Sequence, residues 1–153
     1  MSELRKVLCP VDLSPDASHA AEEAAALAKS LGAELLLLHV MSEPSLAFGE
    51  PLLAPGDATS FTLPVLADDY RREMDSRLTR LGNKLRAQGL SVSTLLMRGT
   101  PHEAITSAAD QEHADLIVMS THGRSGLSHL LLGSVTERVV RTAKVPVMTL
   151  RLN

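Results

Sequence analysis

The feature that most constrains the fold is an apolar run over residues 33–41, Ala-Glu-Leu-Leu-Leu-Leu-His-Val-Met, with turn residues on either side. A strand that is apolar almost without interruption is covered on both faces, as in parallel sheets flanked by helices. Residues 6–11 form a shorter run of the same kind. Ser14 and Pro15 then provide an N-cap and a first-turn proline for a helix from residue 15 to about 31. The chain therefore opens with a strand, a helix and a second strand.

The same alternation continues along the rest of the sequence. The remaining predicted elements are a helix from about 66 that ends at Gly89, a strand over 91–97, a helix over 100–111, a strand over 115–120, a helix from 134 that ends near Lys144, and a strand over 147–152. Ser/Thr-x-x-Glu patterns that begin at Thr100 and Ser134 predict capping boxes for the last two helices. Residues 42–63 have no usable period and are predicted to form a mobile loop.

Strands that alternate with helices in this way predict one α/β domain over residues 1–153, with a five-stranded parallel sheet and helices on both faces. If the sheet is doubly wound from its first strand, the strand order is 3-2-1-4-5. Ligands of such sheets bind beyond the carboxyl ends of the strands at which the winding reverses, here the first and fourth. The sequence therefore predicts a site built from Asp12 and the segment that follows Met119.

Charge and composition exclude several classes of partner. The chain has 15 Lys and Arg against 18 Asp and Glu, a net charge of −3, with one Tyr, two Phe and no Trp, so we expect neither nucleic-acid nor membrane binding. Cys9 is the single cysteine, which fits the reducing cytoplasm. The six histidines lack the spacing of a metal site, and we expect them mostly at the surface or at helix ends.

Residues 120–134 carry the chemistry. They join the fourth predicted strand to a helix whose first amides, at Ser134, Val135 and Thr136, lack helical partners and attract an anion together with the helix dipole. Gly123 and Gly133 permit a positive φ or the close approach of a phosphate, and the hydroxyls of Ser134 and Thr136 add donors. The alternative is a turn with an ordinary N-cap. Neither the P-loop pattern nor Gly-x-Gly-x-x-Gly is present, which argues against P-loop motors and nicotinamide dehydrogenases.

This segment resembles the signature of the universal stress protein family, whose ATP-binding members carry Gly-x-x-Gly, nine residues and Gly-Ser/Thr. The matching residues are Ser120-Thr121-His122-Gly123 after Met119, then nine residues, then Gly133-Ser134. The resemblance extends over the whole chain, through Val7-Leu8-Cys9-Pro10-Val11-Asp12, His39-Val40, Gly99-Thr100-Pro101 and Val145-Pro146-Val147. It implies that the chain binds ATP, with AMP and ADP as alternatives, and that Mg²⁺ accompanies the phosphates.

The resemblance also implies a set of site residues. Pro10, Val11, Asp12 and Val40 would line the adenine and ribose, Met119, Ser120 and Gly123 would flank the nucleotide, and Gly133, Ser134, Val135 and Thr136 would hold the phosphates. Ser120 departs from the pattern because it replaces the first glycine. Its side chain is expected to weaken ATP binding, to favour a shorter nucleotide, or to bond the ribose. Asp12 is expected either to contact the ligand or to bond the turn before Ser14. Arg124 and His122 are further loop candidates for ligand contact.

The leading hypothesis is a stress-response module that binds ATP and acts through its bound state. We expect at most slow hydrolysis, because the sequence places no general base and no arginine finger. A second hypothesis is a nucleotide-independent interaction module whose glycine loop is only structural, and a third is an enzyme of nucleotide α-phosphate chemistry. Residues 145–152 form an edge strand in the predicted order, and the resemblance also implies a two-fold homodimer joined through that strand.

Overall fold

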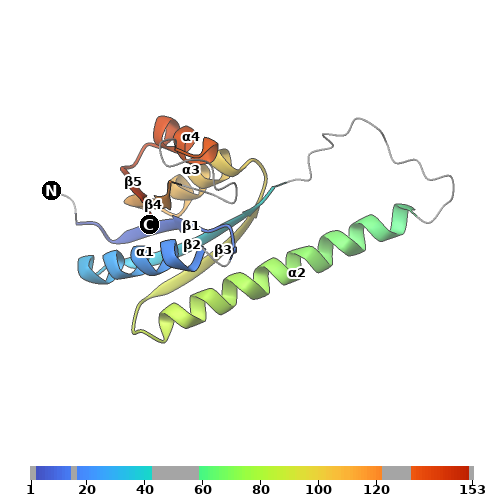
Figure 1. Cartoon of the computed structure of the whole chain (residues 1–153), viewed down its shortest axis with the longest axis horizontal. Coiled ribbons are helices and arrows are strands. Elements are labelled where there is room, and N and C mark those ends of the chain that lie inside the picture. Colours follow the sequence, from blue (N-terminus) through green and yellow to red (C-terminus); the bar gives the residue numbers. More distant parts are fainter. Residues whose placement is uncertain (1–2, 15–16, 43–58, 122–131, 152–153) are drawn as a thin grey trace.

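The computed structural model describes residues 3–14, 17–42, 59–121 and 132–151 (Figure 1). Within these residues, parallel strands form one sheet in the order β3-β2-β1-β4-β5, which confirms the predicted architecture and winding. The strands are β1 (Lys6–Pro10), β2 (Glu34–Met41), β3 (Val92–Arg98), β4 (Leu116–Ser120) and β5 (Val147–Leu150). The helices are α1 (Ala17–Leu31), α2 (Thr59–Arg86), α3 (Pro101–Gln111) and α4 (Ser134–Thr142).

The sheet separates two hydrophobic clusters because side chains alternate along each strand. In β2, Leu35 and Leu37 join the cluster beneath α1 and α2, whereas Leu36 and Leu38 join the cluster beneath α3 and α4. Figure 1 shows these two pairs of helices on opposite sides of the sheet. Both faces of β2 are therefore covered, which is the physical reason for the uninterrupted apolar run in the sequence.

Small residues let α1 lie close to the sheet. Ala21, Ala24 and Ala28 of this helix are fully buried against the strands. Gly32 follows the helix with φ +66°, and the Ala33 N–H donates to the Ala28 carbonyl at 2.8 Å, which is the long bond of a Schellman motif. The predicted glycine stop is therefore confirmed, and it directs the chain into β2.

The helix α2 begins earlier than the sequence predicts. Residues 59–63 are helical, so the end of the predicted 42–63 loop is wrong, while residues 43–58 lie outside the described residues. The helix start is hidden in the sequence because Pro64 lacks an amide hydrogen and because no apolar period precedes it.

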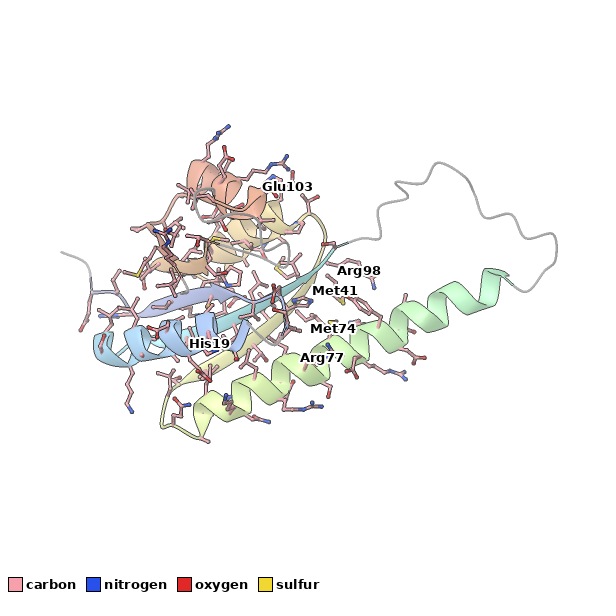
Figure 2. The ribbon with its side chains drawn as sticks, viewed as in Figure 1. His19, Met41, Met74, Arg77, Arg98 and Glu103 are labelled. Carbon is pink, nitrogen blue, oxygen red and sulfur yellow. The ribbon has the colours of Figure 1, made fainter. Side chains whose placement is uncertain are left out.

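Within residues 67–86 of α2, burial of side chains begins at Met74. Residues 67–73 are exposed, and Figure 1 shows this part of the helix projecting past the strands. Met74, labelled in Figure 2, is 5% exposed and begins a buried stripe that continues with Leu78 and Leu85. Among the described residues, no helix is both long enough and apolar enough to span a membrane.

Neither predicted capping box forms. Thr100 precedes α3 and Gly133 precedes α4, and neither helix start has a side-chain cap hydrogen bond. Ser134, predicted to be an N-cap, is instead the first helical residue. The start of α4 is set by the main chain, because the Gly133 N–H donates to the Thr121 carbonyl at 2.8 Å and the Gly133 carbonyl accepts the Glu137 N–H at 2.9 Å. Gly133 therefore takes the N-cap position.

Candidate functional site

The strands β1 and β4 separate toward their carboxyl ends. The two strands pair only at Val7 with Leu116 and at Leu8 with Ile117. Beyond those pairs, β1 continues to Pro10 beside β2, and β4 continues to Ser120 beside β5. The strands at the reversal point thus part before they end, which is the position at which ligands bind in doubly wound sheets.

The amino end of α4 is hydrogen-bonded to the carboxyl end of β4. The Thr121 carbonyl accepts the Gly133 N–H at 2.8 Å, and the Thr136 hydroxyl donates to the Ser120 carbonyl at 3.0 Å. Within the described part of the chain, no hydrogen bond is made by the main-chain N–H groups of Ser134, Val135 and Thr136. These unpaired N–H groups and the helix dipole make the start of α4 suitable for an anion.

Two details of this helix start correct the sequence-based picture. Thr136 is 4% exposed and its hydroxyl hydrogen is directed to Ser120, so it holds the helix to the strand instead of serving as a donor for a ligand. Gly133 has φ −56° and ψ 153°, which any residue adopts, so a positive φ is not the reason for glycine there. What glycine provides at this position is the absence of a Cβ next to the unpaired amides.

Asp12 follows β1 and closes a local turn. Its carboxylate Oδ1 accepts the Ser14 N–H at 2.9 Å and the Ser14 hydroxyl at 2.6 Å. Leu13, between them, has φ +60°, an uncommon left-handed conformation for a branched side chain. The expected bond from Asp12 to the turn before Ser14 is therefore present, and the turn fixes the carboxylate just beyond the carboxyl end of β1.

His39 contacts a residue of the predicted site, Val11, and the sequence did not lead us to expect this contact. Its side chain is 5% exposed, contrary to the expectation of surface histidines, and its Nδ1 lies 2.8 Å from the Val11 carbonyl oxygen. Because a carbonyl only accepts, the Nδ1 atom carries the hydrogen. The Val11 N–H in turn donates to the Leu38 carbonyl at 2.8 Å. Both polar main-chain groups of Val11 are thus held by β2, immediately before Asp12.

A sequence signal for His39 did exist. The residue lies inside the two-sided apolar run, where an imidazole is buried and therefore hydrogen-bonded. Reading the histidines for metal-ligand spacing alone hid this signal.

The predicted site residues gather at one edge of the sheet, from several elements. Pro10, Val11 and Asp12 lie at the end of β1, Val40 lies near the end of β2, Met119 and Ser120 end β4, and Gly133, Ser134, Val135 and Thr136 begin α4. His122, Gly123 and Arg124 lie outside the described residues. The fold therefore brings the described members of the set to the carboxyl ends of the strands.

Metal and thiol chemistry have little support in the described residues. Among them, no group of three or more His, Cys, Asp or Glu side chains is placed to hold a metal ion. Cys9 is fully buried in β1, and burial raises the pKa of its thiol to about 12. A thiol with this pKa stays protonated at neutral pH and is a poor nucleophile.

The parallel sheet in the order β3-β2-β1-β4-β5, with helices on both faces, belongs to the doubly wound α/β class of folds. The profile described as the Universal stress protein family matches residues 3–151, and the chain belongs to that family.

Individual relatives agree with this assignment. The chain is 29% identical to Universal stress protein MJ0577 of Methanocaldococcus jannaschii, over 96% of this chain and 94% of the relative. It is 33% identical to the universal stress protein in the QAH/OAS sulfhydrylase 3' region of Thermus aquaticus, over 96% and 98% of the two chains.

Solved structures share the fold. The structure of MJ0577 superposes with a TM-score of 0.81 at 28% identity and covers 99% of each chain. A universal stress protein solved in complex with cAMP has a TM-score of 0.67 at 23% identity, with 98% of each chain covered. The Archaeoglobus fulgidus protein solved in complex with dAMP has a TM-score of 0.63 at 20% identity, with 97% and 98% covered.

Proposed function

We propose that this protein is a cytoplasmic stress-response module that binds an adenine nucleotide, ATP in the first place with AMP and ADP as alternatives. The observation that carries the proposal is the unpaired amide cluster at Ser134, Val135 and Thr136, located where β1 and β4 part. An anionic group of a ligand supplies the partners that these amides lack. The complexes of related folds with cAMP and dAMP support an adenine nucleotide as that ligand.

The proposed pose follows from the positions of the elements. Pro10, Val11, Asp12 and Val40 line the adenine and ribose, Met119, Ser120 and Gly123 flank the nucleotide, and Gly133, Ser134, Val135 and Thr136 form the phosphate side, with His122 and Arg124 as further contacts. For Thr136, the contribution is its amide, because its hydroxyl is used by Ser120. Mg²⁺ would arrive bound to the phosphates, since the described residues offer no protein cage for it.

A valine at position 133 tests the phosphate side. Its side chain would occupy the space beside the amides, while the backbone angles at Gly133 are accessible to valine, so the fold should persist. With ATP at 100 times its dissociation constant, wild-type protein should gain about 2.7 kcal/mol, a rise in melting temperature of roughly 5–10 °C. Gly133→Val should lose that rise and keep its melting temperature without ATP.

The control is Thr100→Val, at the N-cap of α3. Thr100 has a similar extended backbone and no side-chain cap bond, and it lies at a helix start outside the proposed site. This variant should keep the full ATP response. A Gly133→Val protein that responds like the wild type would place the phosphate elsewhere. A wild-type protein without any response would favour the nucleotide-independent interaction module.

We also propose a two-fold homodimer through the last strand, residues 145–152. The strand β5 is an edge of the sheet, and its own Met148 is 44% exposed, while Val140 of α4 is 47% exposed. An edge ladder with apolar neighbours favours pairing with another chain. Met148→Lys should therefore yield monomers in light scattering, whereas Tyr70→Lys, at an exposed position of α2, should not. A wild-type monomer at micromolar concentration would contradict the dimer.

A further inference from the structure

Leu13 has an uncommon backbone conformation directly after Asp12, in the turn that leads from β1 to α1. Its φ is +60°, in the left-handed region that glycine adopts freely and that a branched residue such as leucine rarely adopts. Strained conformations of this kind persist only where the surrounding contacts impose them, and they gather at ligand-binding and catalytic sites. The contacts that hold Leu13 are therefore informative about its role.

Two sets of contacts hold the left-handed turn. The Leu13 side chain is half-buried and packs on the hydrophobic cluster beneath α1 and α2. The Ser14 N–H and the Ser14 hydroxyl both donate to Asp12 Oδ1, at 2.9 Å and 2.6 Å. Leu13 therefore anchors the turn in the core, while Ser14 ties the carboxylate of Asp12 to the same turn.

The residue before Asp12 is fixed as well. The Val11 N–H donates to the Leu38 carbonyl at 2.8 Å, and the Val11 carbonyl oxygen lies 2.8 Å from Nδ1 of His39. Asp12 is thus held from β2 on one side and by the turn at residues 13–14 on the other. The position of its carboxylate is set by the fold before any ligand arrives.

A connection that only joins two elements has no need of leucine at a left-handed position. The turns after α1 and α2 have glycine there, Gly32 with φ +66° and Gly89 with φ +81°. His113, with φ +53°, belongs to a residue type that is enriched in this region. Leucine at position 13 adds strain, but it also adds a side chain that restrains the turn against the core. Glycine would give the same turn without that restraint.

We propose that Leu13 is a positioning residue for the nucleoside side of the nucleotide site, because its anchored turn holds the Asp12 carboxylate ready for a ligand. The inference rests on the proposed nucleotide binding and adds to it a residue and a role. A group that is already ordered loses little conformational freedom on binding, which raises affinity. A carboxylate accepts hydrogen bonds, so its partner is a donor such as a ribose hydroxyl or the adenine amine, and not a phosphate.

The test compares Leu13→Ala with Leu13→Gly in the full chain. Both changes remove the anchor in the core, but glycine accommodates φ +60° more easily than alanine does. Without ligand, Leu13→Gly should therefore have the higher urea midpoint of the two variants. Its turn is nevertheless the more mobile one, so its affinity for the ligand should be the lower. Urea unfolding measures stability, and calorimetric titration measures the affinities for ATP, adenosine and inorganic triphosphate.

Stability and affinity should thus follow opposite orders in the two variants. The affinity for adenosine and for ATP should fall about three- to tenfold in Leu13→Ala and about threefold further in Leu13→Gly. Binding of inorganic triphosphate should be unchanged, because it has no donor for Asp12. A purely structural role would give the reverse order, because affinity would then follow stability.

His113 provides the matched control. It shares the left-handed conformation but is exposed and lies before β4, at the opposite end of the parallel strands from Asp12. His113→Gly should be more stable than His113→Ala for the same conformational reason. Neither change should alter the affinity for adenosine or ATP, which separates relief of strain in general from the position of the turn beside Asp12.

Three results would overturn the inference. If both Leu13 variants bind adenosine like the wild type, the anchored turn does not position a ligand group. If Leu13→Gly binds adenosine more tightly than Leu13→Ala does, the role of Leu13 is structural. If inorganic triphosphate loses as much affinity as adenosine, the turn positions the phosphate and not the nucleoside. A wild-type protein that binds neither ATP nor adenosine would refute the nucleotide proposal itself, and this inference with it.

Discussion

His39 offers the sharpest test of how β2 supports the site. Replacement by leucine keeps a buried side chain of similar size but removes the N–H that Val11 accepts at 2.8 Å. Val11 is 6% exposed, so its carbonyl has little access to water as a substitute. An unsatisfied buried carbonyl costs about 1–3 kcal/mol, a large share of the roughly 5–15 kcal/mol that stabilises an ordinary domain.

Asparagine separates the hydrogen bond from the imidazole ring. Its Nδ2 is attached to Cγ, as is the histidine Nδ1, so His39→Asn retains a donor for the Val11 carbonyl while it loses ring volume. With a slope of about 2 kcal/mol per molar urea, His39→Leu should lower the unfolding midpoint by roughly 0.5–1.5 M. Because Val11 precedes Asp12, His39→Leu should also weaken ATP binding more than His39→Asn does.

The control is His19→Leu on the exposed side of α1, a position labelled in Figure 2. This change should alter stability by no more than about 0.5 kcal/mol. The reasoning would be refuted if His39→Leu were as stable as the wild type. It would also be refuted if leucine and asparagine at position 39 weakened ATP binding equally, because ring volume and not the hydrogen bond would then matter.

Two further predictions concern the core. A Cβ on Gly82 would lie 2.8 Å from Thr94 Cγ2. Overpacking of this kind costs about 1–3 kcal/mol, which exceeds the gain of about 1 kcal/mol in helix propensity. Gly82→Ala should therefore lower the free energy of unfolding measured in urea. In a Thr94→Ser background the same change should stabilise, and an unchanged sign would contradict the close packing of α2 on β3. Because burial raises the pKa of Cys9 to about 12, Ellman's reagent should label the thiol only in denaturant, and rapid labelling of the native protein would contradict its burial.

The fold was predictable because its signals are collective. The run over residues 33–41 requires cover on both faces, and the order of strands and helices then permits few topologies. Gly32 stops α1 as predicted, because a positive φ there costs glycine little. Each of these features depends either on many residues together or on one strong conformational preference. An error at a single position therefore does not alter the predicted fold.

The sequence-based predictions that were wrong depend on individual contacts. The start of α4 is set by the hydrogen bond between the Gly133 N–H and the Thr121 carbonyl, two residues that are distant in sequence. Gly133 is therefore the N-cap, and not Ser134 as the local pattern predicts. The Thr136 hydroxyl and the His39 ring likewise bind carbonyls on neighbouring elements. No local pattern shows where such a group finds its partner, because the partner is supplied by the folded sheet.

The most direct test of the central claim is a crystal structure of the full chain with ATP. The account predicts one nucleotide beyond the carboxyl ends of β1 and β4, with phosphate oxygens within hydrogen-bond distance of the amides of Ser134, Val135 and Thr136. An ATP molecule bound elsewhere, or side chains that fill the space beyond these strand ends while the chain binds no nucleotide, would contradict it.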